Sequence, residues 1–428
     1  MSMVRAVLLS FFRVLGGIYF RDVEALGVPP EGTRGRLFAA NHVNGLIDPI
    51  LVVTRVPFPI APVAKAPLFK VPVLRTLLRA AEAVPVVRKQ DEPGAPAGSN
   101  EAVFDRVADH FGRGGNLLIF PEGISHDEPQ LAPIKTGPAR MLARAHARGT
   151  RGLTFQAIAL EFDARDTFRS RALVLFGPVR EVDPIAERAG DALVAQITER
   201  LREDLSELVV EGRTWPERRL IARAAEMLAH ESGDHSLAAW NDIGRQVEAA
   251  RRVLSDPNDP RYQRVEAAVS AYYELLQRTG AREDHVVAAV PPKPGRLLRA
   301  IGLVAILPLA LIGALLYAIP YQAPRLATRL AGRERDVVST YKLAIGLAVY
   351  PLWMLGLSLY VLFALRAPQS LAALLVIVLS PLAALLWLDR SELLSARFSA
   401  SRNLGALRDA RAHALAAINQ ARAYVEAS

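Results

Sequence analysis

Residues 36–48 read RLFAANHVNGLID, a short apolar run that is followed at once by a polar cluster. The apolar run has the length and composition of a buried strand. His42 follows it closely, and Asp48 lies six positions further on. A neutral imidazole can take a proton from a hydroxyl, while a carboxylate on its other nitrogen fixes the tautomer and stabilises the charged form. The stretch therefore predicts an acid–base pair at a strand end, although a lone His near an Asp is more often a satisfied loop pair.

Similar apolar runs recur downstream and alternate with helical patterns. The predicted strands are RLFAA, AVPVV, NLLIF, TFQAIAL and ALVLFG, and helical stretches are expected at 100–113 and 138–148. Strands that alternate with helices are typical of an α/β fold. Residues 36–180 are therefore predicted to form one α/β unit.

Composition limits the kinds of partner. The 428 residues include 52 Lys and Arg against 43 Asp and Glu, and there is no cysteine. The absence of cysteine excludes disulfides, zinc thiolate sites and a thiol nucleophile. The basic excess favours an anionic partner, either a membrane surface or nucleic acid.

Three apolar segments favour the membrane, because nucleic-acid binding would explain the charge but not these segments. Residues 301–320, 343–365 and 369–388 contain no charged residue. Each is about long enough to cross a hydrocarbon core of about 30 Å. The link at 366–368 is so short that the second and third segments are expected to form a tight antiparallel hairpin. Basic residues flank the first segment on both sides, which conflicts with one simple crossing. The segment can therefore cross, lie in the interface, or re-enter with Pro308 as the bend.

The remaining regions have simpler patterns. Residues 1–34 are expected to be an N-terminal interfacial amphipathic helix, with an ordinary packed helix as the alternative. Residues 183–292 read as a helical region, and residues 391–428 as an exposed basic helical tail.

Three more polar clusters lie next to predicted strands or helices. Arg88 follows AVPVV, and a guanidinium there suits bidentate phosphate recognition. In the FPEG block, Gly123 allows a tight turn beside a ligand, and Glu122 can accept from hydroxyls. Lys135 places another cation at a helix start. Taken singly, each has an ordinary explanation as a solvated charge or a turn, but all four clusters in this order are not readily supplied by chance.

The four clusters resemble the motifs of the glycerolipid acyltransferases related to 1-acylglycerol-3-phosphate acyltransferase. The resemblance covers about residues 35–180 and rests on Asn41-His42 with Asp48, on VPVVR, on FPEG and on the apolar strand AIAL. FPEGISHDEPQLAPIKTGPARM and EFDARDTFRSRALVLFGPV look closest to the fungal-type glycerol-3-phosphate/dihydroxyacetone-phosphate acyltransferases and their bacterial relatives. Five residues separate His42 from Asp48, one more than is usual, and Gly45 can absorb the additional residue.

The resemblance implies a fold, a reaction and a set of site residues. It implies an α/β acyltransferase domain at 35–182, followed by the helical insert and by membrane-embedded helices at 293–390. His42 and Asp48 would be catalytic, and the residues implied to bind substrate are Asn41, Arg88, Glu122, Gly123 and Lys135. No cofactor and no metal are implied.

The implied reaction moves a fatty acyl group from acyl-CoA or acyl carrier protein to glycerol-3-phosphate or 1-acylglycerol-3-phosphate. The expected partners are membrane lipids, an acyl thioester donor and a phosphorylated glycerol acceptor, with no nucleic acid. We expect an integral membrane protein whose catalytic domain faces the cytoplasm. The alternatives are a thioester hydrolase and a lipid-binding membrane protein with an acyltransferase fold.

Overall fold

The computed structural model describes residues 3–70, 72–87, 101–185, 190–287, 296–331 and 335–427. The chain divides into two compact units. The first comprises residues 1–218, 236–245 and 335–337, and the second comprises residues 219–235, 246–334 and 338–428. Each unit is described separately.

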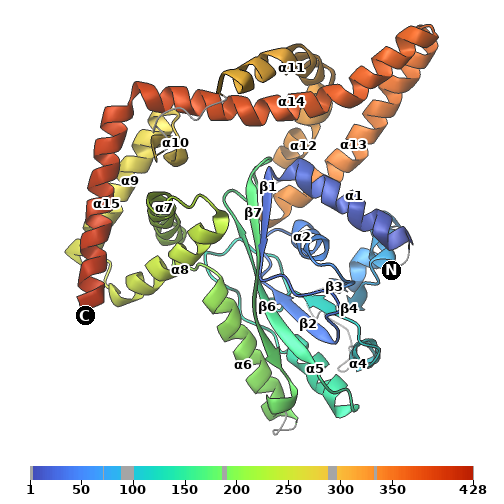
Figure 1. Cartoon of the computed structure of the whole chain (residues 1–428). Helices are drawn as coiled ribbons and strands as arrows, with labels where there is room; N and C mark the ends of the chain where they lie inside the picture. The colour runs from blue at the N-terminus through green and yellow to red at the C-terminus, as the bar shows by residue number, and fades with distance from the viewer. Residues whose placement is uncertain are drawn as a thin grey trace. The chain divides into compact units, whose positions relative to one another are not determined.

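A seven-stranded sheet forms the centre of the first unit (Figure 1). The strand order is β1-β7-β6-β2-β5-β3-β4. Strands β2 to β6 run parallel where they pair, and β7 is antiparallel to β6. The strands are β1 (Asp22–Leu26), β2 (Arg36–Ala40), β3 (Ala61–Lys65), β4 (Val84–Val86), β5 (Leu117–Ile119), β6 (Thr154–Phe162) and β7 (Arg171–Glu181).

Apolar side chains on both faces of β2 explain why this strand lies inside the sheet. Leu37 and Ala39 pack into a core with helices on one face, and Phe38 points to the other face, where its ring contacts Phe58 and Phe176. Alternate side chains of a strand point to opposite faces, so an unbroken apolar run suits a strand covered on both sides. The helices of this unit are α1 (Met3–Tyr19), α2 (Ile47–Arg55), α3 (Pro72–Ala80), α4 (Glu101–Gly112), α5 (Gly137–Ala147) and α6 (Asp191–Leu208), with short 3-10 helices at Ala66–Lys70 and Asp183–Ile185.

The predicted α/β fold is confirmed, but two domain boundaries are wrong. The expected region 1–34 contains β1, which pairs with β7 as an edge strand of the sheet. Helix α6, which was expected to open the helical region, packs Leu193, Ile197 and Leu201 into the core beneath the sheet. Neither β1 nor β3 was predicted, because DVEAL and APVAK lack the apolar run of a buried strand.

Helix α1 exposes an apolar stripe. Val7, Phe11, Val14 and Ile18 are exposed and recur at helical spacing, whereas Arg5 is buried and donates a hydrogen bond to the carbonyl of Ile60. One face of α1 thus packs on the unit, and the opposite face is apolar. Its interfacial role stays a prediction.

The second unit contains a helical core that includes the end of the chain. Its helices include α7 (Trp215–Glu231), α8 (Leu237–Val253), α9 (Pro260–Thr279), α10 (Glu283–Val287) and α15 (Leu404–Ala427), of which α7 and α8 begin in the first unit. Leu407, Ala414 and Ile418 of α15 are buried in this core, and Arg411 pairs with Glu283 at 2.8 Å. The expectation of an exposed tail is therefore wrong, because the alanines and leucines of this segment form a packing face.

The second unit also holds long apolar helices. They are α11 (Arg296–Leu316), α12 (Ala318–Ala331), α13 (Arg335–Ala364) and α14 (Ala367–Arg402). The stretches Thr340–Ala364 and Ala367–Ser391 are long and apolar enough to cross a membrane, and α11 and α12 form a further apolar pair bent by 51°. The bend lies at Tyr317, not at Pro308, which sits inside the continuous helix α11. The chain does reverse between α13 and α14 (Figure 1), but α14 packs chiefly against α11.

Two proline residues explain the polar contacts between these helices. Pro381 has no N–H for the carbonyl of Ile377 four residues earlier, and the Tyr317 hydroxyl donates to that carbonyl at 2.8 Å. Pro320 likewise has no N–H for the carbonyl of Leu316, and the Trp353 indole N–H donates to that carbonyl at 2.8 Å. In both cases an aromatic side chain supplies the donor that the proline cannot.

Candidate active site

The site lies at the edge of the sheet where the parallel strands end. Asn41 and His42 follow β2, and Phe120 to Glu122 follow β5, its neighbour in the sheet. Because β2 and β5 are parallel, their carboxyl ends meet at one edge, which brings the Asn-His and FPEG segments together.

His42 and Asp48 are in direct contact. The Nδ1 of His42 lies 2.9 Å from Oδ2 of Asp48, and the same oxygen accepts the backbone N–H groups of Val43 and Asn44 at 2.9 and 2.8 Å. Asp48 stands in the first turn of α2, and Gly45, with a φ of 44°, turns the chain back toward it. The turn between them is therefore not helical, as the spacing required.

The environment of the pair suits proton transfer. The Asp48 side chain is fully buried, whereas that of His42 is 18% exposed. A carboxylate only accepts, so Nδ1 of His42 donates and Nε2 keeps its lone pair for a hydroxyl proton. The Phe120 ring stacks on the imidazole, with ring centres 4.0 Å apart, and limits its rotation.

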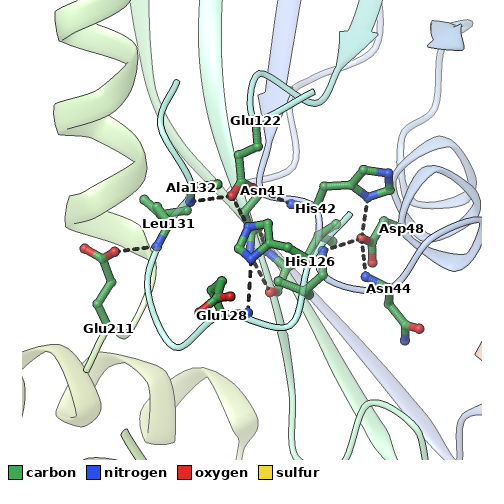
Figure 2. Close-up of polar contacts among 12 residues, drawn as sticks. Asn41, His42, Asn44, Asp48, Glu122, His126, Glu128, Leu131, Ala132 and Glu211 are labelled. Atoms are coloured by element: carbon green, nitrogen blue, oxygen red, sulfur yellow. Dashed lines mark hydrogen bonds and ion pairs between the residues drawn. The ribbon is translucent and has the colours of Figure 1, made fainter. Parts of the chain in front are cut away.

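Glu122 is buried, and both oxygens of its carboxylate accept hydrogen bonds from other residues of the protein (Figure 2). Oε1 accepts the backbone N–H of His42 at 2.7 Å, and Oε2 accepts that of Ala132 at 2.7 Å and also contacts Nε2 of His126. This geometry makes Glu122 an organiser of the His42 backbone. A contact between Glu122 and substrate stays a prediction.

Asn41 is also held within the protein. Its amide Nδ2 donates to the carbonyl of Leu160 at 3.1 Å, and its Oδ1 accepts the N–H of Leu160 at 2.7 Å. The side chain thus extends the pairing of β2 with β6, which fixes the backbone immediately before His42.

The residues expected to hold the acceptor lie along the same edge or outside the described part. Gly123 has a φ of 78°, and a Cβ there would lie 3.7 Å from Cγ of the exposed Lys135. Arg88 lies outside the described residues, two positions after β4. Neighbouring strands are about 4.8 Å apart, so β4, three strands from β2, starts about 14 Å from it.

Sequence reasoning missed His126 and the ion pair of Arg165 with Asp127. Arg165 also donates to the carbonyl of Val43 at 3.2 Å, so the pair ties the FPEG loop to the His42 loop. The signal was present in SHDEP, where a histidine and an acid directly follow the FPEG block. Within the ranges that the structure describes, no three His, Cys, Asp or Glu side chains converge as metal ligands.

Comparisons with known proteins find similar sequences over the domain that contains this site. Residues 20–161 match the family model described as Acyltransferase. Glycerol-3-phosphate O-acyltransferase 2 of Saccharomyces cerevisiae is 28% identical over 193 residues, which cover 44% of this chain and 26% of that protein. Glycerol-3-phosphate O-acyltransferase 1 of the same yeast is 24% identical over 294 residues, 62% of this chain and 38% of that protein. The chain therefore matches well under half the length of these relatives.

A crystal structure of the 1-acyl-sn-glycerophosphate acyltransferase PlsC of Thermotoga maritima is 17% identical, with a TM-score of 0.36 over 48% of this chain and 79% of that chain. Residues 20–161 are thus similar to the acyltransferase family, and the His42–Asp48 pair lies within this matched stretch.

Proposed function

We propose that this protein transfers a fatty acyl group from an acyl thioester to a hydroxyl of glycerol-3-phosphate or 1-acylglycerol-3-phosphate. The observation that carries the proposal is the 2.9 Å contact between His42 and the buried Asp48 at the sheet edge, where the His42 side chain is partly exposed. The named activity of the two yeast relatives favours glycerol-3-phosphate as the acceptor.

In the proposed reaction, Nε2 of His42 removes the proton of the acceptor hydroxyl as its oxygen attacks the thioester carbonyl. The imidazolium that forms is stabilised by the buried carboxylate of Asp48. The tetrahedral intermediate then collapses, the carbon–sulfur bond breaks, and the thiolate takes the proton from Nε2. The products are an ester and a free thiol, and His42 is returned to its neutral form.

The acceptor phosphate would lie away from His42 along the sheet edge. Lys135, which lies beside Gly123, would bind the phosphate together with Arg88. An arginine can bind a phosphate with two parallel hydrogen bonds. The apolar stripe of α1 would hold the domain at the lipid surface where the product belongs.

We further propose that the catalytic domain faces the cytoplasm. Lys342 and Arg390 stand at the outer ends of the apolar stretches 343–365 and 369–388. Positive charge is retained on the cytoplasmic side, so both outer ends would lie there. The catalytic domain would share that side if the segment 301–320 re-enters or lies in the interface.

A substrate panel tests the function. The purified protein in lipid nanodiscs is given acyl-CoA or acyl carrier protein together with glycerol-3-phosphate, dihydroxyacetone phosphate or 1-acylglycerol-3-phosphate, and products are identified by mass. We expect an ester that forms only when acceptor is present. Free fatty acid released at the same rate without acceptor would instead indicate a hydrolase, and no product from any pair would indicate a lipid-binding protein.

A further inference from the structure

The loop that follows the FPEG block contains a buried histidine. His126 is 8% exposed, although Glu128 two residues later is exposed. Imidazole is seldom buried without a partner, because unpaired polar atoms in the interior are costly. Each polar atom of the His126 ring has a partner that the structure identifies.

These partners define the protonation of the ring. The backbone N–H of Glu128 donates to Nδ1 of His126 at 3.2 Å, so this nitrogen carries a lone pair. Nε2 therefore carries the proton, and it contacts Oε2 of Glu122. His126 is thus a neutral donor to a buried carboxylate.

The same two residues hold the backbone of His42 from both sides. Oε1 of Glu122 accepts the N–H of His42 at 2.7 Å, and the backbone N–H of His126 donates to the carbonyl of His42 at 3.2 Å. Figure 2 shows Glu122 between His42 and the loop, with Ala132 as a further donor to its carboxylate. These contacts fix the main chain, whereas Asp48 fixes the imidazole.

We propose that His126 is a positioning residue for His42 and acts through Glu122. The inference rests on the proposed function, since it assigns His126 a part in placing the general base. By donating to Oε2, the His126 ring orients the carboxylate so that Oε1 faces the N–H of His42. Without that donor the carboxylate can rotate, and the backbone of His42 loses a fixed anchor. A displacement of about 1 Å in a catalytic group can cost about a hundredfold in rate.

Two substitutions separate positioning from packing. In His126→Gln, the side-chain amide can reach Glu122 in place of Nε2, so the donor is kept. In His126→Asn, the shorter amide can face Glu128 in place of Nδ1, and the donor to Glu122 is lost. The control is His146→Asn on α5, a histidine that faces Asp183 away from the site.

The readouts are kcat and KM for both substrates, with the unfolding temperature of each variant in detergent. We expect His126→Asn to lower kcat about 10- to 100-fold with KM changed less than about threefold. His126→Gln and His146→Asn should keep at least about a third of the wild-type kcat. In the background Glu122→Gln, adding His126→Asn should lower kcat little further, because both changes break one linkage.

Other results would overturn the proposal. Equal losses in His126→Gln and His126→Asn, or additive losses with Glu122→Gln, would show a packing role alone. A wild-type kcat in His126→Asn would show no role. If His126→Asn does not accumulate as folded protein, His126→Gln decides by itself, and a kcat below about a tenth of wild type would contradict the proposal. A wild-type protein that transfers no acyl group would instead remove the proposed function.

Discussion

Oδ2 of Asp48 accepts a hydrogen bond from Nδ1 of His42 at 2.9 Å and also accepts two backbone N–H groups from the turn that connects them. One oxygen thus orients the proposed base and holds its loop. The other oxygen, Oδ1, is buried and accepts no hydrogen bond from the described part of the chain. Because only Oδ2 accepts hydrogen bonds, a substitution can remove the negative charge of Asp48 and still keep an oxygen that accepts them.

Asp48→Asn is expected to keep the fold and lose rate. Its amide oxygen can replace Oδ2 for all three donors, and its NH₂ group takes the place of Oδ1. Because the neutral amide stabilises the imidazolium of His42 far less, we expect kcat to fall by about a hundredfold or more. Asp48→Ala removes the loop anchor as well and should also lower the unfolding temperature. Equal unfolding temperatures for the two variants, or wild-type kcat in Asp48→Asn, would refute this division of roles.

The hydrogen bond from Tyr317 to Ile377 is expected to depend on Pro381. Tyr317→Phe leaves the Ile377 carbonyl without a donor and should destabilise the protein by about 0.5–2 kcal/mol. In Pro381→Ala the helix supplies its own N–H, so the same Tyr317→Phe change should then cost little. A double-mutant cycle of unfolding free energies in detergent measures the difference. Tyr360→Phe, on an exposed ring of α13, is the control, and additive effects would refute the dependence.

The bent pair α11 and α12 forms either a broken span or a re-entrant loop, and the two differ in the side that Ala323 faces. The natural chain has no cysteine, so a single cysteine can be placed at Ala323 or at Arg366 between α13 and α14. If the bent pair re-enters, a membrane-impermeant maleimide should label Ala323→Cys only in opened cells and Arg366→Cys in intact cells. Labelling of Ala323→Cys in intact cells would mean that α11 and α12 cross as one span.

The helical core of the second unit predicts that Glu226→Gln raises the stability of the protein in a pH-dependent way. Burial raises the pKa of Glu226, which accepts from the Tyr273 hydroxyl at 2.6 Å. A raised folded-state pKa means that wild-type stability falls as pH rises from the usual value of 4.5 through the folded-state pKa. Glutamine does not ionise, so the variant should unfold at a higher temperature than wild type at pH 7.5 but not at pH 4. Glu266→Gln, on the exposed side of α9, should show no such gain, and an equal gain at both pH values would contradict the cause.

The sequence predicted the parts of the fold that depend on local pattern. The apolar runs around Phe38 and Ile158 were predicted as strands because strands buried on both faces are continuously apolar. Strands β1 and β3, which combine polar and apolar residues, were not predicted. Their pairing in the sheet determines their structure more than their own residues do. Pro308 was predicted as the bend from its chemistry, but it lies inside the continuous helix α11, which packs against α14.

The site was predicted as a set of residue types and not as a network. The motif spacing placed His42, Asp48 and Glu122 near one sheet edge. It could not show that Glu122 faces inward, because that follows from donors at Ala132 and His126 in a loop of irregular structure. Contacts between loops depend on tertiary distances, which no periodicity in the sequence reports.

The most direct test of the account is acyl transfer by His42→Ala in the same nanodisc assay with acyl-CoA and glycerol-3-phosphate. Loss of the general base should lower kcat by about 10²–10⁴-fold, while expression, membrane association and unfolding temperature stay close to wild type. A folded His42→Ala protein that keeps more than about a tenth of the wild-type kcat would contradict the assignment of His42 as the base.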